Sequence, residues 1–261
     1  MKALSPSSLI LACLLAVGSA GATCAPDSGV AVYYGNGMFI SPARARVQAL
    51  QMDRKLRPAL AGMKVTFGYS YNNSEDDVTQ VLQVISQALD DKAVQFQAWI
   101  NNPASAPSWA RGAIKSAEQS SRESAFVNDA DLTAHVAKYA ADLAAGKRVI
   151  VVAHSQGNFY ANRAYANLAS TAGFGIVSVG TPANSTAGGG LYTTLTNDQI
   201  IGPVPYRRTP NTTNGTAFTT AAADADGHSF TASYLNGDVS GPQIVAQVKT
   251  TLAGLTCPVG K

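Results

Sequence analysis

The stretch VIVVAHSQG, residues 149–157, decides the fold. Its first five residues, Val149 to Ala153, form an unbroken run of apolar, mostly branched side chains. Such a run is typical of a parallel strand that is buried on both faces of a sheet. The run ends abruptly at His154, and a helical pattern that includes Tyr160 begins directly afterwards. A buried strand followed at once by a helix predicts a β-α unit of a parallel sheet.

Similar units occur on both sides of this stretch. Apolar runs predict strands over residues 30–34, 63–69, 175–180 and 191–195, and helical spacing predicts helices over residues 43–60, 74–89, 132–143 and from 157 onward. This alternation predicts right-handed crossovers and an α/β fold with a mostly parallel central sheet flanked by helices.

Three segments carry more specific expectations. The helix over residues 43–60 has Val47, Leu50 and Leu56 among its apolar positions. Residues 101–128 are rich in Pro, Ser and Ala, so we interpret them as a cap or lid excursion or, equally well, as a plain surface loop. The Thr- and Asn-rich residues 209–216 predict an exposed loop.

Residues 1–22 have the features of a secretory signal peptide. A basic start at Lys2 precedes an apolar run over residues 9–17 and small residues at 20–22 that fit a cleavage site. The run is about half of the ~20 residues that span a bilayer, which argues against a membrane anchor. We therefore expect residues 23–261 to form one exported domain, located in the periplasm or in the extracellular medium.

Cysteine content and charge narrow the class of protein further. Cys24 and Cys257 lie near the two ends of the mature chain, and an oxidising compartment favours a disulfide between them over two unpaired thiols. The net charge is +3, and basic residues adjoin one another only in short groups such as Arg207 and Arg208. Nucleic acid is therefore not an expected partner.

Ser155 lies at the junction between the predicted central strand and the following helix. The residues two positions away on either side, Ala153 and Gly157, are small. A serine in this context is typical of a nucleophile elbow, where larger neighbours would clash with the adjacent strand and helix, although Ala153 replaces the usual first glycine. We predict that Ser155 attacks an acyl carbon and that the backbone N–H of Gln156 receives the resulting oxyanion.

A second oxyanion donor is expected from the glycine loop that follows the first strand. Asn36, Gly37 and Met38 lie at the carboxyl end of a strand that is predicted to neighbour the central one. Glycines in such a loop allow backbone N–H groups to approach a ligand closely. The alternative is an ordinary glycine turn.

A serine nucleophile needs a base, and in this fold the base follows the nucleophile and the acid in the chain. Of the three histidines, His135 precedes Ser155 on the polar side of a predicted helix, where we expect it to be solvated. His154 adjoins Ser155 and cannot easily reach its own neighbour. His228 is the remaining candidate and the predicted general base.

The acid that orients the base should lie between Ser155 and His228. This interval contains no Glu and three Asp residues: Asp198, Asp224 and Asp226. Asp198 follows a predicted strand, from where a carboxylate could reach across to His228, so we favour it. Asp224 and Asp226 are close to His228 in sequence and could shape its loop instead; Asp226 is the alternative acid.

Five segments together resemble the landmarks of lipase-like α/β hydrolases: YGNG (34–37), AHSQGN (153–158), VGTP (179–182), TND (196–198) and GHSF (227–230). The resemblance extends from about residue 29 to the C-terminus. It implies an α/β-hydrolase fold with Ser155, Asp198 and His228 as nucleophile, acid and base.

This resemblance, together with the residues above, leads to a functional expectation. We expect an exported serine hydrolase that cleaves small-molecule or lipid carboxylic esters through an acyl-enzyme, without a metal or cofactor. Thioesterases and amidases use the same triad, so they remain alternatives, as does a non-catalytic secreted binding domain on a hydrolase scaffold. A lid at residues 101–128 would add peripheral contact with lipid.

Overall fold

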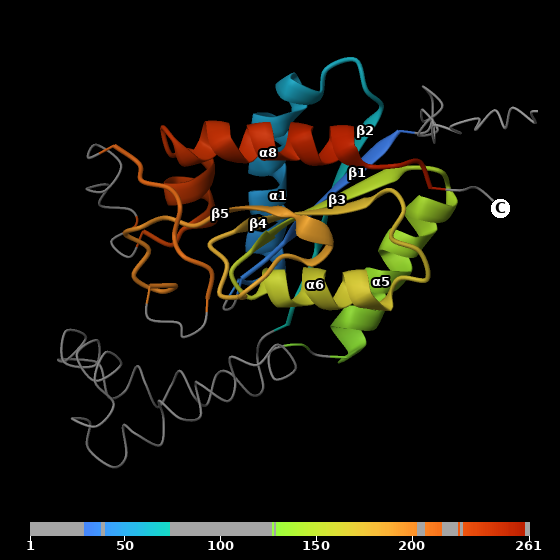
Figure 1. Cartoon of the computed structure of the whole chain (residues 1–261), viewed down its shortest axis with the longest axis horizontal. Helices are drawn as coiled ribbons and strands as arrows, with labels where there is room; N and C mark the ends of the chain where they lie inside the picture. Colours follow the sequence, from blue (N-terminus) through green and yellow to red (C-terminus); the bar gives the residue numbers. More distant parts are fainter. Residues whose placement is uncertain are drawn as a thin grey trace, which may run out of the picture.

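The computed structural model describes residues 29–37, 40–73, 127, 129–202, 207–215, 224 and 227–258. Within them, five parallel strands form one sheet in the order β2-β1-β3-β4-β5 (Figure 1). The strands are β1 (Val30–Gly35), β2 (Val65–Ser70), β3 (Arg148–His154), β4 (Phe174–Val179) and β5 (Leu191–Thr193). The predicted α/β fold with a parallel central sheet is confirmed, and each predicted strand overlaps an observed one.

In the described residues, four α-helices accompany the sheet: α1 (Pro42–Leu56), α5 (Asp129–Ala144), α6 (Gly157–Asn167) and α8 (Ser240–Gly254). Shorter helical turns are η1 (Arg57–Leu60), η4 (Ala187–Gly189) and the π-helix η5 (Phe230–Leu235). The expected helices over 43–60, 132–143 and from 157 onward are confirmed. The expected helix over 74–89 lies outside the described residues.

Strand β3 lies at the centre of the sheet, and every one of its residues after Arg148 is buried. The chain runs outward in one direction from β1 to β2 and in the other direction from β3 to β4 and β5. The order therefore reverses between β1 and β3. In sheets of this type, ligands bind beyond the carboxyl ends of the strands at the reversal point. Asn36 and Ser155 follow those two ends.

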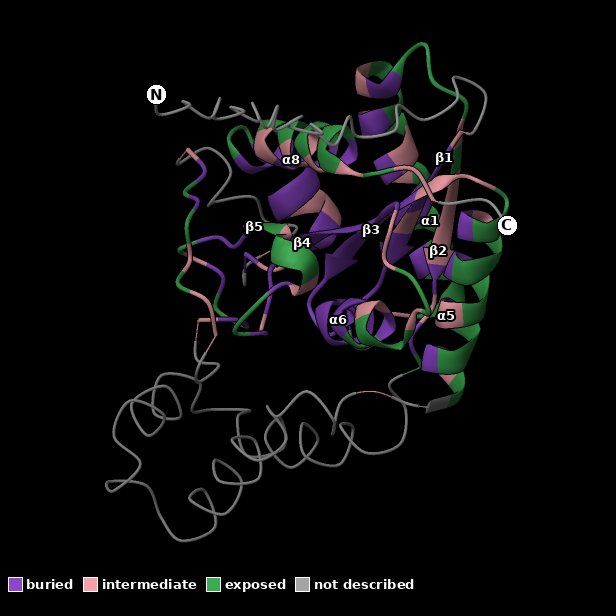
Figure 2. Ribbon diagram, turned by 45° about the vertical axis from the view of Figure 1, so that its right-hand side comes forward, coloured by how far each residue is buried: buried purple, intermediate pink, exposed green. Residues whose placement is uncertain are grey.

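The two faces of the sheet carry separate apolar cores. Helices α1 and α8 cover one face, while α5 and α6 cover the other (Figure 1). The first core joins strand residues to side chains of α1 and α8, among them Met52, Leu56, Ile244 and Val248. The second joins β3 and β4 to Leu132, Tyr139, Tyr160 and Ala164 of α5 and α6. With both faces covered, β3 and β4 are buried along their lengths (Figure 2).

Helix α1 turns a different side toward the sheet than the one that carries Val47 and Leu50. Val47 and Leu50 are each 51% exposed. The side that packs inward carries Ala45, Ala49, Met52 and Leu56. These four positions recur at intervals of three and four residues, so they form one continuous stripe on a helix. The spacing of all four positions, rather than the apolar character of Val47 and Leu50, therefore indicates which side of the helix is buried.

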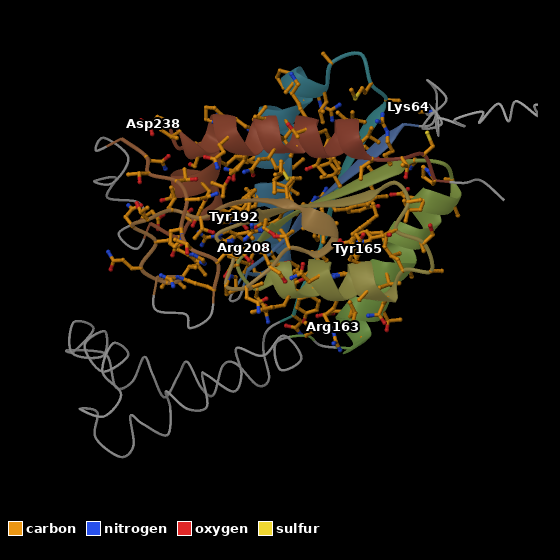
Figure 3. All side chains as sticks on the ribbon, in the orientation of Figure 1. Lys64, Arg163, Tyr165, Tyr192, Arg208 and Asp238 are labelled. Carbon is orange, nitrogen blue, oxygen red and sulfur yellow. The ribbon has the colours of Figure 1, made fainter. Side chains whose placement is uncertain are left out.

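The segment 207–215 packs along β5 and is only in part the exposed loop that its composition predicts. The Asn211 side chain bonds to Thr194 N (3.0 Å) and Tyr192 O (2.9 Å), and the Arg208 guanidinium lies 3.6 Å from the Tyr192 ring centroid (Figure 3). Thr212 and Asn214 are buried. The prediction holds for Thr209, Asn211 and Thr213, which are exposed, and is wrong for Thr212 and Asn214, because these two side chains find partners within the fold instead of water.

Several sequence-based expectations fall outside the described residues. They concern the signal peptide, Met38, Asp226 and the cap or lid segment apart from Val127. The Cys24–Cys257 disulfide stays a prediction, because Cys24 is also outside them. In the part of the chain that the structure describes, no helix has both the length and the apolarity needed to cross a membrane.

Candidate active site

Ser155 occupies the turn between β3 and α6. Its φ angle is +53°, and it is the one non-glycine residue with positive φ in the described part of the chain. This left-handed conformation is strained for an L-residue, at a cost of about 1–3 kcal/mol, and such strain concentrates at functional sites. The Ser155 N–H donates to Val179 O (3.1 Å), which holds the turn against the end of β4. The geometry is that required of a nucleophile elbow.

Asn158 holds the same turn from within α6. Its Nδ2 donates to Ser155 O (2.9 Å) and to Val179 O (3.2 Å), and the side chain is buried. The sequence analysis assigned Asn158 no role of its own. Its position one helical turn after the strand end was the available signal, since Asn favours local bonds to the backbone at helix starts.

The loop after β1 packs directly against Ser155. A Cβ atom on Gly37 would lie 2.8 Å from the Ser155 Cβ and 3.3 Å from its Oγ. On the other side of the contact, a Cβ on Gly157 would lie 2.6 Å from Gly35 O. Because these approaches leave no room for a side chain, both glycines are needed to bring the two strand ends together.

Asn36 acts as a clamp on this loop. Its Nδ2 donates to Gly37 O (2.9 Å) and Asn72 O (3.1 Å), and its Oδ1 accepts from Asn72 N (2.9 Å). The Asn72 side chain in turn donates to Asn36 O. The side chain of Asn36 is thus occupied in tying the ends of β1 and β2 together. Any contribution of this loop to an oxyanion site would come from its backbone, next to Gln156 at the start of α6.

Asp198 and His228 form a hydrogen-bonded pair across the loops, in which Asp198 is buried and His228 is partly exposed. The Nδ1 atom of His228 lies 2.8 Å from Asp198 Oδ2, and the Asp198 side chain is completely buried. An ionised carboxylate only accepts, so Nδ1 carries the proton and Nε2 is left as the basic nitrogen of a neutral ring. Asp198 Oδ1 also accepts from the N–H groups of Ile200 (3.0 Å) and Ile201 (2.9 Å), which fixes the carboxylate.

Tyr234 is a member of this network that the sequence analysis missed. Its hydroxyl donates to Asp198 Oδ2 at 2.6 Å and accepts from Leu195 N at 3.2 Å. Burial and the neighbouring Asp198 raise the pKa of Tyr234 well above its usual value, so the phenol stays protonated. No local pattern identifies this residue, because its partners are brought to it only by folding.

His154 lies between the nucleophile and the base. Its Nε2 is 2.9 Å from the backbone carbonyl of His228, and the two imidazole rings are 4.7 Å apart between centroids. Burial, with a contribution from His228, lowers the pKa of His154 well below 6.5, which keeps the ring neutral. Among the described contacts no hydrogen bond joins Ser155 Oγ to His228. Such bonds are often long without substrate and tighten in the substrate complex.

Asp224 supports the loop that carries His228. Its Oδ2 accepts from Ser229 N (2.8 Å) and from the Ser233 hydroxyl, which anchors the start of η5. His135 does not belong to this site. The prediction that it is solvated is wrong: it is buried against Tyr139 and Tyr160, with Nε2 2.8 Å from Tyr71 O.

The structure therefore gathers two groups of predicted residues on either side of His154. Ser155, Gln156 and Gly37 lie on one side, while His228 and Asp198 lie on the other. No group of three or more His, Cys, Asp or Glu within the described residues could hold a metal ion. Comparison of the chain with protein-family models, with curated proteins and with solved structures finds no match.

Proposed function

We propose that this protein is an exported serine hydrolase with an α/β-hydrolase fold that cleaves carboxylic esters. One observation carries the proposal: the strained Ser155 at the end of the central strand lies next to His154, whose ring contacts His228, the histidine that is bonded to the buried Asp198 carboxylate. Backbone strain and a buried carboxylate are each costly, and their coincidence at one point supports a catalytic site.

The topology supports the same proposal. The nucleophile follows β3, the acid lies shortly after β5, and the base comes later in the chain, just before η5. This order of Ser, acid and His along the chain is the order found in α/β-hydrolases. The reversal of strand order between β1 and β3 lies beside Ser155, and ligands bind at such reversal points in sheets of this type, which supports the same proposal.

The first half of the reaction forms an acyl-enzyme. His228 Nε2 takes the proton of the Ser155 hydroxyl while Oγ bonds to the carbonyl carbon of the ester. The oxyanion that develops is held by backbone N–H groups of Gln156 and of the loop at Gly37, assisted by the positive end of the α6 dipole. When the intermediate collapses, the bond between the acyl carbon and the alcohol oxygen breaks, and His228 returns the proton to the leaving alcohol.

The second half releases the acid. A water molecule gives a proton to His228 Nε2 as its oxygen bonds to the acyl carbon, and the bond to Ser155 Oγ then breaks with return of the proton to Ser155. Throughout, Asp198 holds His228 with Nδ1 protonated and stabilises the positive charge on the ring. Tyr234 and two backbone N–H groups keep Asp198 itself in place.

The decisive experiment uses the mature protein and a series of p-nitrophenyl esters of increasing acyl length. We expect turnover by the wild type and loss of at least about 10³-fold in Ser155→Ala and His228→Ala. Ser170→Ala removes an exposed serine hydroxyl and serves as the matched control, with activity unchanged. A fluorophosphonate should label the wild type but not Ser155→Ala. A folded wild type that neither hydrolyses an ester nor reacts with the fluorophosphonate would contradict the proposal and favour a non-catalytic binding domain.

A further inference from the structure

His154 takes no part in the reaction steps above, yet it is buried at the centre of the site. We propose that His154 is a positioning residue that locks the loop carrying His228 onto the turn carrying Ser155. This inference rests on the proposed function, because it concerns the alignment of the same nucleophile and base. It assigns to His154 a positioning role that the AHSQG motif alone does not reveal.

The contacts of the ring support this task. The Nε2 atom lies 2.9 Å from the carbonyl oxygen of His228, and since a carbonyl only accepts, Nε2 carries the proton and donates it. The same ring packs on His228 at 4.7 Å between centroids, on Phe230 at 5.5 Å and on Tyr234 at 5.7 Å. One side chain therefore contacts the base, the start of η5 and the tyrosine that holds the acid.

The backbone of His154 makes these contacts relevant to catalysis. His154 is the last residue of β3 and the direct neighbour of Ser155. The ring belongs to a residue of the central strand. Because His154 is joined to Ser155 by one peptide bond, its contacts fix the position of the His228 loop relative to Ser155. A displacement of about 1 Å between reacting groups can cost roughly 100-fold in rate, so a direct tie of this kind has catalytic value.

The second ring nitrogen, Nδ1, indicates that the His154 side chain does more than fill space. Nδ1 is buried and has no hydrogen-bond partner among the described residues, and it faces Gly37, where an added Cβ would lie 3.3 Å away. A buried acceptor without a partner is destabilising, and an apolar residue would avoid that penalty. The donor at Nε2 is the property that a leucine would lack.

The neutral state of the ring also suits this place. His228 becomes positively charged during the proposed reaction, and a second cation 4.7 Å away would oppose that charge. The ionisable groups that face His154 are His228 and Tyr234, with Asp198 behind them. A neutral imidazole supplies the hydrogen bond without adding repulsion, which a lysine or arginine at this position could not do.

The test compares His154→Leu with His154→Gln. Leucine removes the donor, whereas the glutamine Nε2 can reach the His228 carbonyl. We expect His154→Leu to lower kcat about 100-fold with KM changed less than about threefold, and His154→Gln to recover activity to within about tenfold of wild type. His135→Leu and His135→Gln form the matched control, because His135 is a buried histidine that also bonds to a backbone carbonyl. Both should fold with kcat within about threefold of wild type.

Equal losses in His154→Leu and His154→Gln, or a leucine variant with wild-type kcat, would overturn the positioning role. A second readout does not depend on activity: the downfield Nδ1 proton of His228 in the NMR spectrum of the full mature chain. It should be observed in the wild type and in His154→Gln and be lost by exchange in His154→Leu. If the wild type hydrolyses no ester, the proposed function fails, while an unchanged proton in His154→Leu rejects the positioning role separately.

Discussion

His228 and Tyr234 donate hydrogen bonds to the same oxygen atom, Oδ2 of Asp198, at 2.8 and 2.6 Å. The other oxygen accepts two backbone N–H groups. The carboxylate is thus surrounded by four donors while its side chain is completely buried. A buried carboxylate is tolerated only when its oxygens are well paired, and these four donors satisfy both oxygens of Asp198 next to His228.

Replacing Tyr234 with Phe removes one of these donors and leaves the Leu195 N–H without its acceptor. We expect a loss of about 1–3 kcal/mol in the free energy of unfolding, measured by urea denaturation. Because the Asp198 carboxylate then loses one of the donors that hold it beside His228, kcat for ester hydrolysis should also fall. Tyr34→Phe loses a comparable buried bond to Gln48 and should lower stability without lowering kcat.

Asp198→Asn should leave the protein folded but nearly inactive. An asparagine amide can donate to Nδ1, which would move the proton of His228 to Nε2 and remove the base. We expect kcat for ester hydrolysis to fall by about 10⁴-fold, as a wrong tautomer does in serine-protease triads. Asp238→Asn changes a carboxylate that caps Gly215 N and should keep wild-type activity. An active Asp198→Asn enzyme would point to another acid, with Asp226 tested next by the same substitution.

Gly37→Ala should impair the site through its shape. The new methyl group would lie 2.8 Å from the Ser155 Cβ, so the loop after β1 has to move away from the nucleophile. We expect a loss of roughly 100-fold in kcat/KM, because donors that have shifted by about 1 Å no longer meet the oxyanion. Gly254→Ala is the control, since nothing lies within 4 Å of its added methyl group. Wild-type activity in Gly37→Ala would exclude this loop from the oxyanion site.

Stability should decrease as the pH falls below about 6.5. Burial lowers the pKa of both His135 and His154, so below this pH the unfolded chain binds protons that the folded chain does not. The folded state is therefore penalised by up to about 1.4 kcal/mol per pH unit for each histidine, and the penalty is absent above pH 6.5 to 7. Urea denaturation between pH 5 and 8 measures the slope. His135→Gln should make it shallower; an unchanged slope would mean that His135 does not contribute.

Local patterns were sufficient for most of the architecture. The apolar run at 149–153 and its abrupt end at His154 predicted the central strand and the turn, because a strand buried on both faces must be apolar throughout. The same signals were less informative about which side of a helix faces the sheet and about the last helix of the chain. Helix α1 was predicted, yet Val47 and Leu50 proved exposed, and helix α8 was overlooked although Ile244, Val248 and Leu252 recur at four-residue intervals along it.

The sequence by itself determined the strands, the tight turn at Ser155 and the short list of candidate acids and bases, since these depend on residues that are neighbours in the chain. Only the tertiary structure decided that Asp198 reaches His228, that Tyr234 shares its oxygen and that His154 bonds to the His228 backbone. These partners are 30, 36 and 74 residues apart. Hydrogen bonds depend on distances of a few tenths of an ångström, and such distances between remote loops exist only after the sheet and its two layers of helices have assembled.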